Sequence, residues 1–203
     1  MRTTAKPILG VVFGSAVLLS LSVGSRVVHG QAQHVRWDIV SLQFNTPPGM
    51  NTVSPGGVAD ASARNPNTLK IKLTGSGTFV ALVGGGPTGA VTGGGTWETF
   101  NGAVSTGSGT YVVTRLASWE FANFQTPGVN NDTIGLNAAN GNAVLRIQYS
   151  DGSDGTLGIG CHGPGAPPGI VEGVIATKDF VTYWDAGAPA PGVNANRTSF
   201  HIE

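Results

Sequence analysis

The chain has little cysteine and little charge. Cys161 is the only cysteine among 203 residues, so no disulfide can form within one molecule. Charged residues make up 11% of the sequence, and acidic and basic residues balance. Nucleic-acid binding depends on neutralising phosphates with clustered lysine and arginine, and these residues are scattered here. We therefore expect neither a disulfide scaffold nor a nucleic-acid partner.

Familiar catalytic and cofactor motifs are also missing from the sequence. There is no Gly-x-Ser-x-Gly elbow, and the glycines of residues 84–86 are not followed by the Gly-Lys-Ser/Thr of a phosphate loop. Zinc-type Cys/His spacing and an EF-hand loop are likewise absent from the sequence. We expect no cofactor and no metal ion.

The longest hydrophobic run lies at the N-terminus and predicts a secretory signal peptide, residues 1–32. Arg2 and Lys6 precede the uncharged residues 7–25, and small residues at positions 30 and 32 suit a signal peptidase. We predict cleavage near Ala32, or two residues earlier, giving a secreted or periplasmic protein with no stable membrane insertion. A retained membrane anchor is the alternative.

Cleavage would change the charge balance. Three of the eleven basic residues, Arg2, Lys6 and Arg26, lie in the predicted signal peptide. The remaining chain would carry eight basic residues against eleven acidic ones and would be mildly acidic.

Residues 33–203 predict one β-rich domain. Apolar and polar residues alternate with a period of two, and clusters of Gly, Asn, Asp and Pro separate these runs, as is typical of antiparallel strands. The expected strands are residues 35–44, 69–73, 78–83, 96–101, 109–124, 143–161 (a hairpin), 170–177, 180–184 and 198–202. Residues 45–67, 84–95 and 125–142 are expected to be loops.

The predicted fold class is all-β, with a single antiparallel β-barrel. An up-and-down barrel, similar in general shape to lipocalin or dirigent barrels, is favoured by the successive hairpins and removes exposed sheet edges. A β-sandwich is the alternative. Residues 109–124 make a strand so long that it requires a bend or β-bulge, and Arg115 interrupts its apolar face.

A glycine-rich motif occurs twice, as TGSGTFV in residues 74–80 and TGSGTYV in residues 106–112. In each copy the glycines are followed by a threonine and then by an aromatic residue, at the start of an expected strand. We interpret the motif as repeated hairpin chemistry, because the spacing does not continue as a solenoid would require.

Every tryptophan is followed by a carboxylate. The four pairs are Trp37-Asp38, Trp97-Glu98, Trp119-Glu120 and Trp184-Asp185. Consecutive strand residues point to opposite faces, so each tryptophan and its acid lie on different sides of the sheet. One interpretation buries the tryptophans and leaves the acids in solvent. The other turns Glu98 and Glu120 into the barrel, where two carboxylates would perform acid–base chemistry.

Cysteine and histidine stand next to each other at Cys161 and His162. A catalytic or metal-binding pair needs side chains that face each other, whereas strand neighbours face apart. We expect Cys161 to be a buried structural thiol. His34 and His201, near the ends of the remaining chain, are expected to be solvated or hydrogen-bonded, with metal ligation alongside His162 as the alternative.

The leading functional hypothesis is an exported, non-enzymatic barrel that binds a small apolar ligand or a surface partner in or around the barrel. A barrel enzyme of the isomerase or cyclase type and a structural or adhesive surface protein are the alternatives. The candidate ligand-binding residues are Glu98, Arg115, Glu120, Arg146, Tyr149, His162 and Tyr183. A second polar group would frame one end of a pocket or lie on its solvated rim, and it comprises Glu172, Lys178, Asp179, Tyr183 and Asp185.

Overall fold

A computed structural model describes residues 32–45 and 50–203. The predicted signal peptide therefore lies outside the described residues, except for Ala32. The described residues form only strands and connecting turns; none belongs to a helix, and so none to a helix able to cross a membrane.

Fourteen strands are present in the described part of the chain. They are β1 (Gln33–Gln43), β2 (Asn51–Pro55), β3 (Ala59–Ser62), β4 (Leu69–Leu73), β5 (Ser76–Ala81), β6 (Gly94–Asn101), β7 (Val104–Phe124), β8 (Asn130–Asp132), β9 (Ala138–Tyr149), β10 (Asp154–Cys161), β11 (Gly173–Lys178), β12 (Val181–Tyr183), β13 (Asp185–Ala186) and β14 (Gly192–Ile202).

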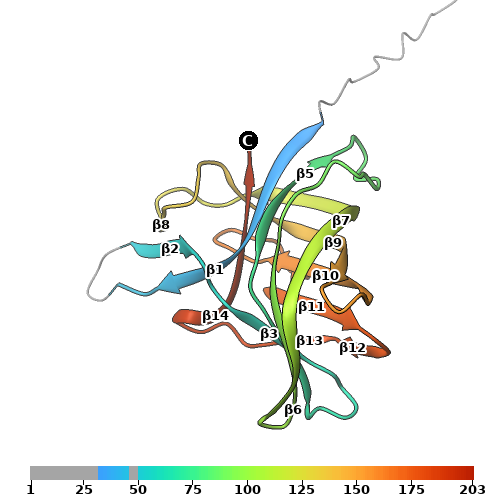
Figure 1. The fold of residues 1–203 in the computed structure, drawn as a ribbon. Coiled ribbons are helices and arrows are strands. Elements are labelled where there is room, and N and C mark those ends of the chain that lie inside the picture. Colours follow the sequence, from blue (N-terminus) through green and yellow to red (C-terminus); the bar gives the residue numbers. More distant parts are fainter. Residues whose placement is uncertain (1–31, 46–49) are drawn as a thin grey trace, which may run out of the picture.

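Six of these strands close into an antiparallel barrel (Figure 1). Around the ring their order is β1, β5, β6, β7, β9 and β14, and β14 pairs with β1 to close it. This is also their order along the chain, with the other strands inserted between them. The predicted all-β fold and antiparallel barrel are confirmed.

The remaining strands lie outside the ring. β10, β11 and β12 extend the sheet from β9, and β4, β3 and β13 extend it from β6. β2 pairs with the end of β1 and, in parallel, with β8. Residues 45–67 and 125–142 were therefore wrongly expected to be loops throughout. Their strands are short and polar, and they form by hydrogen bonding to neighbours rather than through an alternating pattern of their own.

Aromatic side chains fill the barrel interior. Trp37, Trp97 and Trp119 are buried in one continuous apolar core. The Trp119 ring lies 4.6 Å from that of Phe200, and the Trp97 ring lies 5.6 Å from that of Tyr149, both edge to face. Such contacts add to the free energy gained by burying large rings. A ligand site therefore has to be sought outside this packed interior.

The repeated glycine motif lies beneath these tryptophans. Gly77 in β5 is the cross-strand partner of Trp37, and Gly109 in β7 is that of Trp97. A β-carbon added at either glycine would come within 3.0 Å of the tryptophan Nε1 atom. The interpretation as hairpin chemistry was thus incomplete, because the second glycine of each copy lies within a strand and leaves room for an indole ring.

The long strand β7 is bent by irregular pairing, as its length predicted. Its register with β9 shifts between Val113 and Arg115, and again at two later positions. Val113 and Leu116 both face the core, and the exposed Arg115 falls at the shift between them. The bulge explains why a charged residue interrupts the apolar face.

Candidate ligand-binding cleft

The two carboxylates expected inside the barrel lie outside it. Trp97 and Trp119 point inward, so Glu98 and Glu120 point away from the core. Glu98 forms an ion pair with Lys72 at 3.9 Å, and Glu120 is exposed. The inward placement is therefore wrong. Glu98 and Glu120 consequently do not form the acid–base site that the isomerase or cyclase interpretation requires.

The other two Trp-acid pairs differ from each other. Trp37 is in the core, and Asp38 lies on the opposite face, where it accepts two hydrogen bonds from the Arg36 guanidinium at 2.8 and 2.9 Å. The interpretation that buries each tryptophan and leaves its acid in solvent therefore fails twice, because Asp38 is only 1% exposed and Trp184 is 56% exposed.

The remaining candidate residues do not form one site. Arg115 and Arg146 are cross-strand neighbours on the exposed face of β7 and β9. Tyr149 and Tyr183 are buried in the core, where the Tyr149 hydroxyl donates to the Thr177 carbonyl at 2.9 Å. His162 lines the cleft described next, whereas Arg115 and Arg146 line a separate depression of about 340 Å³ on β7, β9 and β10.

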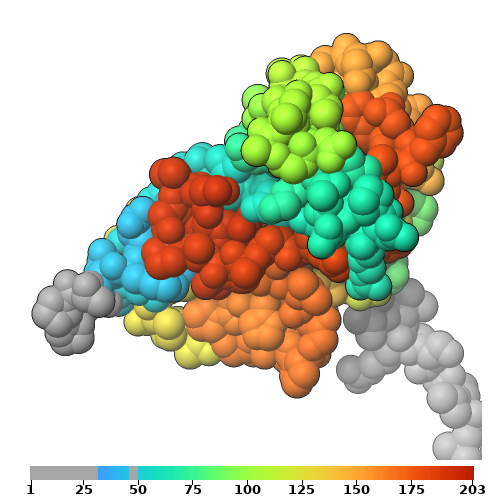
Figure 2. All heavy atoms as spheres, turned by 90° about the horizontal axis from the view of Figure 1, so that it is seen from below, coloured from blue at the N-terminus to red at the C-terminus, as the bar shows by residue number. Residues whose placement is uncertain are grey.

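This cleft has a volume of about 310 Å³ and lies on the outer face of the barrel. It is formed where β1, β2, β8 and β14 meet the segment between β10 and β11. In Figure 2 the yellow segment around β8 lies between the blue β1 and the orange residues that precede β11. Its apolar lining comprises Val40, Leu42, Phe44, Val53, Val129 and Pro164. Its polar lining includes Asp132, His162, Glu172, Arg197, Thr198 and Ser199.

Strand alternation explains how β14 presents its polar residues to the cleft. Phe200 points into the core, so Ser199 and Arg197 point toward the outer face of the barrel. Val40 of β1 is paired with Arg197, which brings apolar and charged groups together. This row of polar residues is visible in the sequence, but the candidate residues did not include it.

Glu172 fastens the segment before β11 to β14. One carboxylate oxygen accepts a hydrogen bond from the His162 N–H, and the other accepts from the Thr198 N–H at 2.7 Å. Burial raises the pKa of Glu172, and these hydrogen bonds together with the nearby Arg197 counteract part of the rise. The carboxylate is therefore already engaged by donors of this chain.

Asp132 fastens β8 to the barrel in a similar way. Its Oδ2 lies 2.9 Å from His201 Nε2, and its Oδ1 accepts the Ile134 N–H at 2.9 Å. Burial disfavours the charged form of Asp132, but the His201 and Ile134 hydrogen bonds outweigh it and lower the pKa. Sequence analysis did not select Asp132, because its partner is 69 positions away.

Arg197 differs from both acids because no ion pair engages it within the described residues, although its charge lies near enough to Glu172 to counteract part of the rise in that carboxyl's pKa. It is half-buried, and its Nε atom is buried without a hydrogen-bond acceptor in residues 32–45 and 50–203. Within those residues it forms no ion pair. The cleft therefore combines apolar walls with one guanidinium that can donate hydrogen bonds to an external partner.

Cys161 lies beside the cleft as a structural thiol, as expected. It is 1% exposed, and its Sγ lies 3.4 Å from Gln125 Nε2 and 3.3 Å from the Thr198 carbonyl oxygen. Burial raises its pKa far above the ordinary thiol value, so the reactive thiolate is suppressed.

The three histidines in the described part of the chain do not gather into a metal site. His34 is exposed, His201 contacts Asp132, and His162 Nδ1 lies 2.9 Å from the Ile170 carbonyl oxygen. Among the residues described, no three His, Cys, Asp or Glu side chains are grouped to hold a metal ion.

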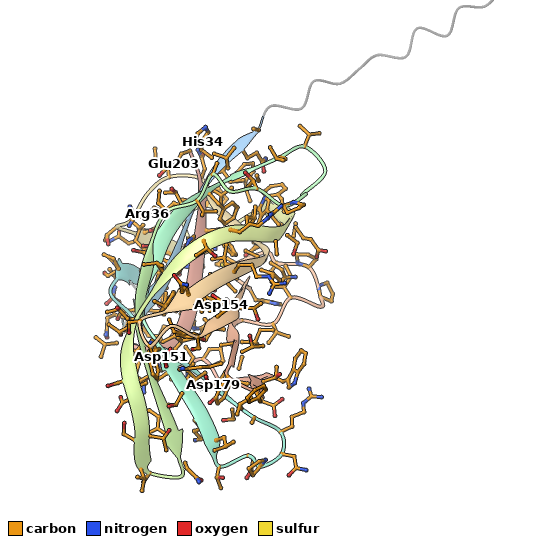
Figure 3. The ribbon with its side chains drawn as sticks, turned by 45° about the vertical axis from the view of Figure 1, so that its right-hand side comes forward. His34, Arg36, Asp151, Asp154, Asp179 and Glu203 are labelled. Atoms are coloured by element: carbon orange, nitrogen blue, oxygen red, sulfur yellow. The ribbon has the colours of Figure 1, made fainter. Side chains whose placement is uncertain are left out.

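The second polar group is also dispersed. Lys178 is only 3% exposed, and its Nζ contacts Asp151 and Asp179 while lying 4.4 Å from the Trp97 ring centroid. Figure 3 shows Asp151, Asp154 and Asp179 in one region, away from His34, Arg36 and Glu203. Asp185 pairs with Arg64, so only Glu172 of this group lines the cleft.

The fold and cleft define a closed antiparallel barrel with a partly apolar depression on its outer wall. No protein-family model matches the chain, and comparisons with curated proteins and with solved structures also give no match.

Proposed function

We propose that this protein is an exported β-barrel that binds a small, largely apolar ligand in the cleft on its outer wall. The observation that carries the proposal is the contrast between the packed barrel interior and this cleft. Its volume of about 310 Å³ falls at the lower end of the range for small-molecule sites. Apolar walls with a few polar groups are typical of such sites.

The proposal places the ligand between two parts of the chain that hydrogen bonds hold in place. Glu172 anchors the segment that contributes His162, and Asp132 anchors the segment that contributes Val129. A cleft held in this way loses little conformational entropy when a ligand binds, which favours affinity.

A fluorescent dye tests this proposal. N-phenyl-1-naphthylamine is neutral and apolar, and its emission rises in apolar surroundings. We expect saturable binding to the wild-type protein. The Val129→Trp variant, which places an indole at the cleft wall, should weaken binding at least tenfold.

Val112→Trp is the matched control, because Val112 is also exposed but does not line the cleft. It should bind the dye like the wild type. Absence of saturable binding, or equal weakening by both substitutions, would contradict the proposed site.

A surface partner is the second candidate, favoured by exposed aromatic residues at one end of β7. Phe121 and Phe124 are 39% and 53% exposed, and their rings stack edge to face at 5.1 Å. Exposed apolar clusters mark interaction surfaces. If the partner is a second copy of the chain, sedimentation should show an oligomer that the double variant Phe121→Ser/Phe124→Ser converts to monomer. A monomeric wild type would contradict this candidate.

A further inference from the structure

The polar groups of the cleft are unequally satisfied. Asp132 and Glu172 each accept two or more hydrogen bonds from donors of the chain. Arg197, by contrast, forms no ion pair within the described ranges, and its buried Nε–H lacks an acceptor there. The buried Nε is closed to a ligand oxygen, so an external acceptor has to meet the Nη groups of Arg197, which are not buried in this way.

We propose that Arg197 binds the carboxylate of an apolar monocarboxylic acid whose hydrocarbon part lies along the apolar wall of the cleft. This inference rests on the proposed function and names the class of ligand. The guanidinium is planar, and its two Nη groups present donors that match the two oxygens of a carboxylate. A neutral alcohol of the same shape can accept a hydrogen bond from one Nη group but brings no charge to balance the guanidinium.

The surroundings of Arg197 fix the orientation of the ligand. Arg197 is the cross-strand neighbour of Val40, and Val40 packs with Leu42 and Val53 in a small apolar cluster beside it. A carboxylate on Arg197 therefore directs the attached chain toward these side chains and on to Val129 at the cleft wall. A second charge on the ligand would meet this apolar surface and be desolvated without a partner.

Decanoate and 1-decanol provide a matched test, because they share a hydrocarbon chain and differ in charge. Each is titrated against bound N-phenyl-1-naphthylamine at pH 7.5, and the displacement constant is measured. For the wild type we expect decanoate to bind about tenfold or more tightly than decanol, because a charge-assisted pair of hydrogen bonds to Arg197 replaces the single neutral hydrogen bond that an alcohol can accept. In Arg197→Gln this preference should vanish while decanol affinity is unchanged.

Two further variants separate a specific contact from other effects. Arg197→Lys retains the charge without the planar fork, so its preference for decanoate should be intermediate. Arg146→Gln removes an exposed arginine outside the cleft and should keep the full preference. Thermal unfolding of each variant checks that the barrel remains folded.

Each remaining outcome overturns a distinct claim. Equal displacement by decanoate and decanol from the wild type would overturn the carboxylate inference and leave the proposed apolar cleft intact. Equal loss of both affinities in Arg197→Gln, or loss of the preference in Arg146→Gln, would also overturn it. If the dye does not bind the wild type, the proposed function fails and the inference fails with it.

Discussion

His201 and Asp132 are 69 positions apart in the sequence and meet at 2.9 Å through His201 Nε2 and Asp132 Oδ2. The contact joins β14, a barrel strand, to the short strand β8 outside the ring. It is reinforced by Thr133, whose hydroxyl donates to the Val53 carbonyl at 2.9 Å. One wall of the cleft is therefore held by polar contacts rather than by an extensive apolar core.

Replacing Asp132 with Asn should weaken this attachment in a pH-dependent way. The folded-state pKa of Asp132 lies below its ordinary value of 3.8, despite burial, because of its hydrogen bonds. The stabilisation is thus fully present above about pH 4 and is lost as the pH falls through the folded pKa. We expect urea unfolding to show Asp132→Asn about 2 kcal/mol less stable at pH 6, with a smaller difference at pH 3.

The control for this measurement is Asp154→Asn. Asp154 is exposed, so its replacement should change the unfolding free energy at pH 6 by no more than about 0.5 kcal/mol. A difference between wild type and Asp132→Asn that grows as the pH falls would contradict the assigned role of Asp132.

Replacing Lys178 with Ala should destabilise the barrel. The Lys178 ammonium lies over the Trp97 and Tyr149 rings, at 4.4 and 4.8 Å from their centroids. Its hydrogen bond to Asp151 lowers the pKa of that carboxyl to about 2. Loss of the desolvated cation–π contacts and of the packed side-chain stem should cost about 2 kcal/mol in chemical denaturation. Lys70→Ala, at an exposed position, should have little effect; equal effects of the two would show that Lys178 contributes no more than a surface lysine.

Replacing Gly77 with Ala should strain the pairing of β5. An added β-carbon would lie 2.2 Å from the Thr92 carbonyl oxygen and 2.9 Å from Trp37 Nε1. Because backbone and a core ring must both shift, we expect a loss of about 2 kcal/mol in thermal or urea unfolding. At Gly86 no atom lies within 4 Å of the added carbon, so Gly86→Ala should be nearly neutral. A Gly77→Ala protein as stable as Gly86→Ala would refute the idea that tryptophan packing requires this glycine.

The barrel was predictable because its main strands carry their own alternating pattern. The expected strand at residues 96–101 falls within β6, and the length of β7 together with Arg115 indicated a bulge before any register was known. The short strands β2, β3 and β8 were missed, because hydrogen bonding to neighbours decides their structure.

The candidate site was less predictable for a physical reason. Alternation places Glu98 and Glu120 on the face opposite their tryptophans, but it does not say which face is the core. Two interpretations therefore stayed open, and only one of them put the two carboxylates outside the barrel. Asp132 and Arg197 both line the cleft only because segments far apart in the sequence come together there. The polar residues on the outer face of β14 are visible in the sequence. That β8 packs against this face becomes apparent only once the barrel is closed.

The location of the ligand site is tested most directly by nuclear magnetic resonance of the 15N-labelled protein titrated with decanoate. The backbone amides of Val53, Asp132 and Arg197 should shift saturably, while the indole N–H signals of the buried Trp37, Trp97 and Trp119 should stay nearly unchanged. Largest shifts at those indole signals, with little change at the cleft amides, would place the ligand inside the barrel and contradict the proposed external cleft.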